Sequence, residues 1–224
     1  LGIGGFNLFS RAYTGETTNV MVRMSENGPI GRRMFSESRL QLRSTDNQSQ
    51  SSVEAPTIRV NDAFTGGGAQ MRGGQRGFTF EFASDLDYVR GAHSWRTGAL
   101  IEGGSFTSDD ISTYLGTFPF PSLADYNASK PATFSRRVGD PNLTYSTLQA
   151  AIYLQDDWRV SSKLTLNLGL RWDVYQPWVE IEDRQSNFDE TTGQFVLASD
   201  NATLGGVQVG RYLQTYSKGD LGPR

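Results

Sequence analysis

The segment Leu148–Tyr175 constrains the fold most, because two long runs of alternating hydrophobic and polar residues are joined by a short polar turn. In the second run, one face carries Leu164, Leu166, Leu168, Leu170, Trp172 and Val174, and the other carries Thr165, Asn167, Gly169, Arg171, Asp173 and Tyr175. The first run repeats the pattern with an apolar row of Leu148, Ala150, Ile152, Leu154, Trp158 and Val160, interrupted by Asp156. A period of two indicates β-strands. Since a transmembrane strand needs about 9 to 11 residues and a typical globular strand has about 5 or 6, the segment predicts a membrane-spanning β-hairpin.

The composition argues against a helical membrane protein but agrees with a β-barrel. Hydrophobic residues make up only 37% of the 224 residues, and no stretch approaches the roughly 18 consecutive apolar residues of a membrane helix. A barrel hides its apolar residues by alternation and can therefore be polar on average. The 25 glycines and the aromatic content of 12% favour an all-β fold.

A net charge of −3 argues against a nucleic-acid partner, and the absence of cysteine excludes disulfides. The chain begins at Leu1 without a Met, a basic n-region or an apolar h-region, so either a targeting segment was removed or the chain is an internal piece of a longer protein, and we favour the internal piece.

Three hairpins can be drawn, and each turns over a short connection. They pair 17–25 with 32–44 across 26–31, 77–90 with 94–106 across 91–93, and 148–160 with 164–175 across 161–163. Long polar connections at 45–76, 107–147 and 176–223 separate the hairpins. Outer-membrane barrels have short periplasmic turns and long extracellular loops. The pattern predicts one domain over 1–224, an antiparallel transmembrane β-barrel fragment of about six strands.

The second hairpin predicts which residues face the lipid and which face the lumen. Phe78, Phe80, Phe82, Leu86 and Tyr88 alternate with Thr79, Glu81, Ala83, Asp85 and Asp87. We expect the three carboxylates to face water in the lumen, with Arg96, Arg159 and Arg171 as partners on other strands. Leu100 falls on the lumen face, against the pattern. Tyr88, Trp95 and Trp158 lie beside short turns, whereas Phe78, Phe106, Trp172 and Tyr175 lie at the opposite strand ends, as two aromatic girdles would require.

The sequence offers no catalytic, cofactor-binding or metal-binding residues, so we expect no enzyme. His93 is the only histidine and lies in a short turn, which argues against a Ser-His-Asp triad and against zinc. Glu81, Asp85 and Asp87 could suggest glycosidase chemistry, but the period of two explains them as lumen-facing residues. The loop segments 64–77 and Phe118–Pro121 are either ligand-facing tips or a flexible loop with a proline turn. Residues 187–198 predict a small hairpin that turns near Thr192 and Gly193.

The stretch YLQDDWRVSSKLTLNLGLRWDVYQP, followed by NFDETTGQFVLA, resembles the barrel of TonB-dependent outer-membrane transporters of the Oar-like type. These proteins often carry a carboxypeptidase-regulatory-like N-terminal domain. FTGGGAQ at 64–70 and GAHSWRTGALIEGG at 91–104 are similar to stretches of that family, and DLGPR at 220–224 resembles the start of a next strand. The resemblance implies a barrel of about 22 strands, closed by a plug and energised from the inner membrane through a TonB box. We find neither plug nor TonB box in this chain.

The resemblance implies a receptor or transporter segment in the outer membrane of a Gram-negative cell. Its expected partners are outer-membrane lipid, the remainder of the barrel and plug, TonB and an unidentified ligand whose binding residues the sequence does not reveal. Two alternatives remain. The chain could belong to a structural or adhesive outer-membrane barrel without energised transport, or it could be a soluble carbohydrate-binding β-sandwich whose alternating strands pack sheet on sheet.

Overall fold

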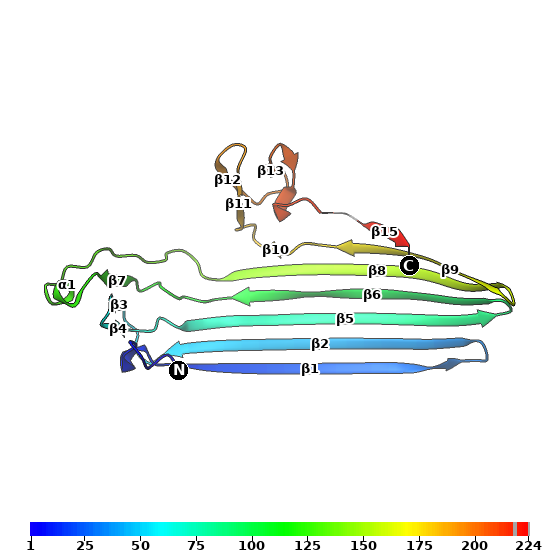
Figure 1. Ribbon diagram of the computed structural model, residues 1–224, viewed down its shortest axis with the longest axis horizontal. Coiled ribbons are helices and arrows are strands. Elements are labelled where there is room, and N and C mark those ends of the chain that lie inside the picture. Colours follow the sequence, from blue (N-terminus) through cyan, green and yellow to red (C-terminus); the bar gives the residue numbers. More distant parts are fainter. Residues whose placement is uncertain (217–218, 224) are drawn as a thin grey trace. The chain divides into compact units, whose positions relative to one another are not determined.

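A computed structural model describes residues 1–216 and 219–223, and long antiparallel strands dominate it (Figure 1). The main sheet has the order β1-β2-β5-β6-β8-β9-β15, and the short strand β10 (Val179–Glu180) pairs with β8. The bounds are β1 Tyr13–Ile30, β2 Met34–Ser51, β5 Arg72–Arg90, β6 His93–Ser108, β8 Leu143–Ser161, β9 Leu164–Tyr175 and β15 Asp220–Pro223. The all-β prediction and its six strands are confirmed, and β15 is the expected next strand. Within the described ranges, no helix is long and apolar enough to cross a membrane.

The first hairpin turns later than predicted. Its strands were expected at 17–25 and 32–44, but β1 and β2 each have 18 residues and meet at 31–33, where Gly31 adopts a φ of 68°. Asn27, Gly28 and Pro29 therefore belong to β1 instead of to the turn. Strand β1 lies at the edge of the sheet, and an edge strand tolerates a proline because one row of its backbone groups needs no partner there.

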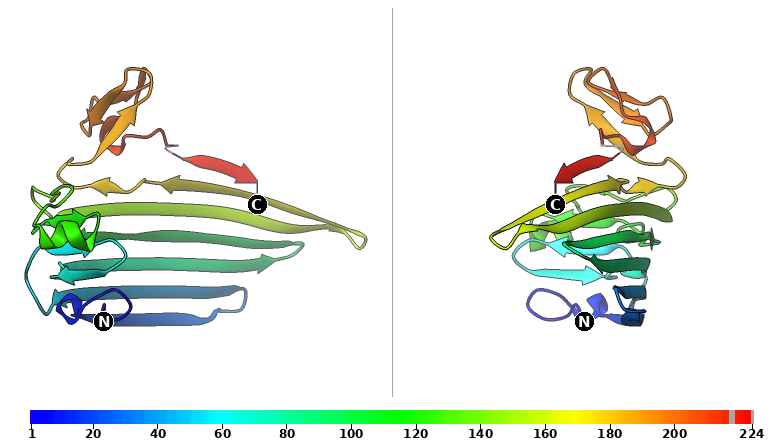
Figure 2. Two further views of the ribbon diagram at one scale, coloured as in Figure 1. Left: turned by 60° about the vertical axis from the view of Figure 1, so that its left-hand side comes forward. Right: turned by 90° about the vertical axis from the view of Figure 1, so that its right-hand side faces the viewer.

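The hairpin of β8 and β9 has the predicted alignment. Ile152 is opposite Trp172, Leu154 is opposite Leu170, and the register shifts by one residue between Arg159 and Ser161, just before the turn. Both strands exceed the length needed to span a membrane, with 19 and 12 residues. Strands β5, β6, β8 and β9 lie side by side in each of the views in Figure 2.

The chain divides into two compact units. The first unit comprises Leu1–Asn19, Thr45–Arg76 and Thr107–Leu143, and the second comprises Val20–Ser44, Gly77–Phe106 and Thr144–Arg224. In the first unit, the long strands continue into the predicted connections, and the remaining residues form a small sheet of their own. Its strands are β3 (Thr57–Val60), which is antiparallel to β4 (Phe64–Gly67) and parallel to β7 (Thr117–Phe120). Helix α1 (Leu123–Asn127) follows β7 and is capped by Ser122, whose hydroxyl accepts from the N–H of Asp125.

The two loop segments singled out in the sequence form the interior of this first unit. The buried side chain of Gln70 donates to Oγ1 of Thr57 at 2.9 Å and to the carbonyl of Gly116 at 2.6 Å, and it accepts from the N–H of Leu115 at 2.9 Å. Phe120 packs edge-on against Tyr126, with ring centroids 5.3 Å apart. Gln70 and Phe120 themselves are therefore buried, whereas Arg72, Arg76 and Pro121 of the same segments are exposed. The bonds of Gln70 to Leu115 and Gly116 join the connection at 45–76 to the connection at 107–147.

The connection after β9 also carries structure. The predicted small hairpin is confirmed as β11 (Ser186–Asp189) and β12 (Gln194–Leu197), with Gly193 at a φ of 70° in its turn. A second short pair, β13 (Thr203–Leu204) and β14 (Val207–Gln208), follows it, and 3₁₀ segments lie at Phe9–Arg11 and Gly210–Tyr212. The buried residues of this connection form a small core of their own, Ala198, Ala202, Val209 and Leu213.

Candidate functional site: the two faces of the sheet

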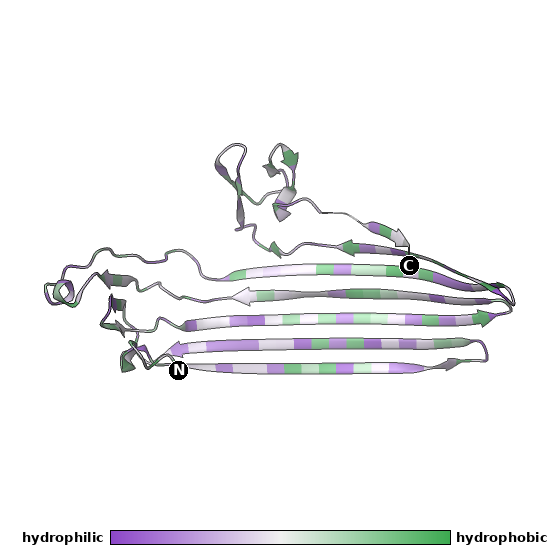
Figure 3. Ribbon diagram, viewed as in Figure 1, coloured by the Kyte–Doolittle hydropathy of each residue, from purple (hydrophilic) through white to green (hydrophobic). Residues whose placement is uncertain are grey.

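The apolar face of the sheet is uncovered. Figure 3 shows hydrophobic and hydrophilic residues alternating along the long strands. On β8, which lies between β6 and β9, Leu148, Ile152 and Leu154 are 46%, 55% and 56% exposed. The other sheets among the described residues have only two or three strands. In a β-sandwich these rows would be buried between two sheets, so the sandwich alternative is wrong. A large uncovered apolar surface requires an apolar environment.

An aromatic stack marks the short-turn end of this face. The ring of His93 stacks on Trp95 at 5.0 Å and on Trp158 at 5.4 Å, and Tyr88 stacks on Trp95 at 5.6 Å. The expected placement of Tyr88, Trp95 and Trp158 at one level is confirmed, and the three rings come from β5, β6 and β8. Amphipathic aromatic rings at such a level are typical of a membrane interface.

His93 has a partner that the sequence analysis missed. Its Nδ1 lies 2.6 Å from Oδ2 of Asp156, the residue that interrupts the apolar row of β8. A carboxylate on an apolar face needs a hydrogen-bonding partner to offset its lost hydration. The sequence did contain a signal for this contact. Asp156 is an acidic residue in an apolar row, and it lies near the turn of its hairpin, as His93, the only histidine of the chain, lies at the turn of the preceding hairpin.

The opposite face carries a network of charged groups. Arg96 lies 3.8 Å from Asp85 and 3.7 Å from Asp87, and it donates to the hydroxyl of Tyr153 at 3.2 Å. The Tyr153 hydroxyl in turn donates to Asp85. Arg96 was predicted as the cross-strand partner of these carboxylates, and this is confirmed. The three strands β5, β6 and β8 are thereby connected on the face that was predicted to be wet.

Two other predicted pairings differ. Glu81 is paired with Arg39 of β2 at 3.1 Å, a partner that was not predicted because the alignment of β2 was uncertain from the sequence. Arg171 forms a two-pronged contact with Asp173, two residues along its own strand, at 2.7 and 2.8 Å. Arg159 lies on an exposed position near the turn. Leu100, which breaks the pattern, lines a hollow of about 160 Å³ whose wall combines Ala83 and Ala151 with the charged side chains of the polar face.

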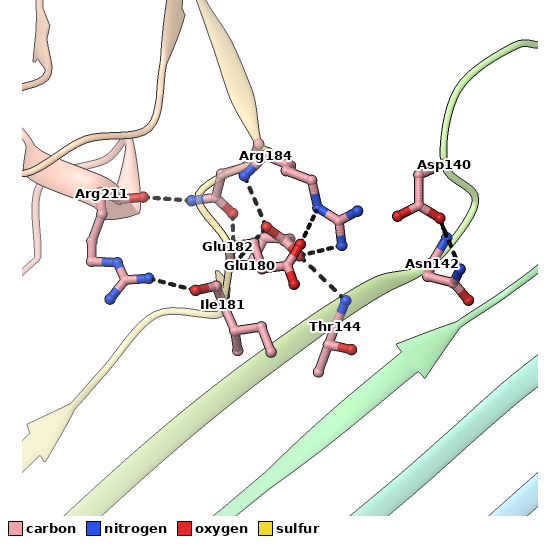
Figure 4. Close-up of polar contacts among 9 residues, drawn as sticks. Asp140, Asn142, Thr144, Glu180, Ile181, Glu182, Arg184 and Arg211 are labelled. Carbon is pink, nitrogen blue, oxygen red and sulfur yellow. Dashed lines mark hydrogen bonds and ion pairs between the residues drawn. The ribbon is translucent and has the colours of Figure 1, made fainter.

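A buried carboxylate holds the start of the last connection against β8 (Figure 4). Glu180 is 0% exposed, and its carboxylate accepts from the backbone N–H groups of Arg184 at 2.8 Å, Glu182 at 3.0 Å and Thr144 at 3.4 Å. The Arg184 guanidinium lies 3.1 Å from the same carboxylate. Burial alone would raise the pKa of Glu180, but the bonds from Arg184, Thr144 and Glu182 outweigh it and hold the pKa below its ordinary value. Glu180 therefore fixes the loop in its charged form.

A metal centre has no counterpart in the parts of the chain that the structure describes: no three His, Cys, Asp or Glu side chains come close enough to hold an ion. Glu81, Asp85 and Asp87 have arginine partners, as described above. The second unit therefore has one apolar face and one hydrogen-bonded polar face.

The comparisons with known proteins agree with this arrangement. The family model described as an outer membrane beta barrel domain matches residues 9–224. A search of curated proteins and a search of solved structures each returned no match. The family match covers nearly the whole chain, and it assigns the uncovered apolar face to outer-membrane lipid and the polar face to the lumen. The chain belongs to the outer-membrane β-barrel domain family and resides in the outer membrane.

Proposed function

We propose that the chain forms part of the wall of a TonB-dependent receptor that takes up a ligand across the outer membrane, and that it carries out no catalysis. The structural observation behind this proposal is the lumenal face. Charged and hydroxyl side chains from three strands contact one another there, namely those of Asp85, Asp87, Arg96 and Tyr153. A polar interior is common to outer-membrane barrels, and this one offers a passing ligand both charged groups and a hydroxyl group. The dependence on TonB is inferred from the resemblance of the β8–β9 hairpin to Oar-like transporters.

Binding to TonB tests this proposal directly. The protein that carries this chain is purified in detergent from outer membranes and titrated with the purified periplasmic domain of TonB. We expect saturable binding that a peptide copy of a TonB box abolishes. A second arm measures crosslinking of the two proteins in cells, where the plug is in its native place.

Absence of binding in both arms would contradict energised transport. The structural or adhesive alternative would then account for the barrel, because such a barrel has the same lipid-facing rows and needs no contact with the inner membrane.

A further inference from the structure

A hollow of about 310 Å³ lies on the lumenal face of the second unit, where β5, β6, β8 and β9 run side by side. Gly103 and Gly104 contribute to its lining. A Cβ atom at Gly104 would lie 2.4 Å from the carbonyl oxygen of Phe78, and one at Gly103 would lie 2.8 Å from that of Thr147. A Cβ at Gly103 would also meet the side chains of Leu148 and Phe80, which belong to the apolar face, whereas a Cβ at Gly104 would meet the side chain of Thr79 on the lumenal face. Gly104 is therefore the position whose missing side chain leaves room on the lumenal side.

Two exposed aromatic rings line this lumenal hollow. Tyr175, at the end of β9, was predicted to belong to an aromatic girdle, but it lines the lumenal hollow and is 53% exposed. Trp178, three residues further on, is 43% exposed. Water-facing positions of a barrel are usually polar, so two large exposed aromatic rings on this face are unusual. Tyrosine and tryptophan present a broad apolar face and a polar edge, which suits a ligand that is itself apolar on one side and polar on the other.

The remaining lining is rich in hydrogen-bonding groups. Gln149, Thr79, Glu81 and Glu102 contribute to it. Glu81 is held by Arg39, whereas the Glu102 carboxylate makes no hydrogen bond or ion pair with the residues at 1–216 or 219–223. The carboxylates disfavour an anionic ligand. A carboxylate and an amide beside an aromatic ring instead offer acceptors for hydroxyl groups.

We propose that the lumenal hollow binds a neutral saccharide. One sugar ring lies against Trp178 or Tyr175 with its C–H face, and its hydroxyls donate to Glu102 and to the side-chain oxygen of Gln149. The hollow is at the lower end of the range of about 300–1,000 Å³ for small-molecule sites, so one or two rings fill it. This assignment rests on the proposed function in one respect, because it makes a saccharide the ligand that is taken up.

The test is equilibrium binding by the purified protein in detergent. An array of neutral oligosaccharides is screened first, and the strongest binder is titrated by isothermal titration calorimetry, which needs no tryptophan as reporter. We expect Trp178→Ala and Glu102→Gln each to weaken its affinity by about tenfold or more. Trp172→Ala, which removes an exposed ring from the opposite face, and Glu182→Gln, which neutralises an exposed loop carboxylate, serve as matched controls and leave the affinity unchanged. Heat-modifiable migration confirms that each variant is folded.

Several outcomes would overturn the assignment: no bound glycan on the array, equal affinity in wild type and both hollow variants, or binding of cationic probes such as spermidine alone. The experiment contains no TonB, so its result is independent of energy coupling. If the protein binds a saccharide but not TonB, the saccharide site is supported and the proposal of TonB-dependent transport is contradicted. If it binds TonB but no saccharide, only the saccharide site is contradicted.

Discussion

The contact between His93 and Asp156 joins two hairpins on the lipid-facing side. Oδ2 of Asp156 lies 2.6 Å from the imidazole, and the buried Oδ1 has no hydrogen-bond partner in the described part of the chain. We expect His93→Ala to lower the free energy of unfolding by about 1–3 kcal/mol, because a carboxylate is left without its partner. The double variant His93→Ala/Asp156→Ala should lose less than the sum of the two single variants. Urea unfolding in lipid vesicles measures this, and strictly additive losses would contradict the pairing.

Glu180 predicts a dependence of loop stability on pH. Its pKa in the folded protein is below that of the unfolded chain, about 4.3, so the stabilisation is complete above that pH and is lost as the pH falls through the lower folded pKa. At pH 7 we expect Glu180→Gln to destabilise the docked loop by about 1.5–3 kcal/mol, with the difference from wild type narrowing below about pH 4. The stability of the docked loop is measured by hydrogen exchange at the backbone amides of Thr144 and Arg184, corrected for the intrinsic exchange rate at each pH.

The neighbouring Glu182 provides the matched control for this experiment. Its side chain is 64% exposed although it also lies near Arg184, and an exposed ion pair contributes little to stability. Glu182→Gln should therefore leave exchange at Thr144 unchanged. A loss of protection that is equal in both variants, or that persists unchanged at pH 3.5, would show that charge on Glu180 is not what holds the loop.

At the level of the strand, β9 offers a direct test of which face meets lipid. Leu168 lies in the uncovered apolar row, and its neighbour Asn167 points to the other face. Leu168 is opposite Asp156, close to the aromatic level of Trp158, so Leu168→Arg should cost about 1–2 kcal/mol, between the values for the interface and for the bilayer midplane, and should lower assembly. Asn167→Arg should be tolerated. The measurement is the fraction of heat-modifiable protein in outer membranes. Equal assembly of the two variants would refute the orientation.

The strands show what a sequence can and cannot reveal. The period of two identified β5, β6, β8 and β9 and their faces, because each side chain's environment there is set by lipid on one side and water on the other. The turn after β1 was placed too early, since turn-forming residues also occur on an edge strand. Pairings such as Glu81 with Arg39 depend on the alignment of strands far apart in the sequence. The Gln70 network was missed for the same reason, because Leu115 and Gly116 are distant backbone groups. Glu180 binds mainly the nearby Glu182 and Arg184, and only Thr144 is distant, but no residue pattern in the loop marks a carboxylate that accepts from backbone N–H groups.

Across the whole molecule, the sheet is open. Its described order begins at β1 and ends at β15, and these two edge strands do not pair with each other. The outer-membrane barrels with the fewest strands have eight, and every backbone group in lipid must be paired. Residues Val20, Val22 and Met24 of β1 add exposed apolar side chains to one free edge. In a larger barrel, of which we expect this chain to be a part, the rest of the wall would pair with both edges.

This requirement predicts how the 224-residue chain behaves on its own. When it is expressed separately and refolded in detergent, we expect oligomers or aggregates, because the unpaired edges of β1 and β15 offer backbone groups to other copies. The complete protein, refolded in the same way, should be monodisperse and heat-modifiable. Size-exclusion chromatography with light scattering distinguishes the two. A monodisperse, heat-modifiable monomer of the isolated chain would mean that its strands close on themselves, and the partial-barrel assignment would then be wrong.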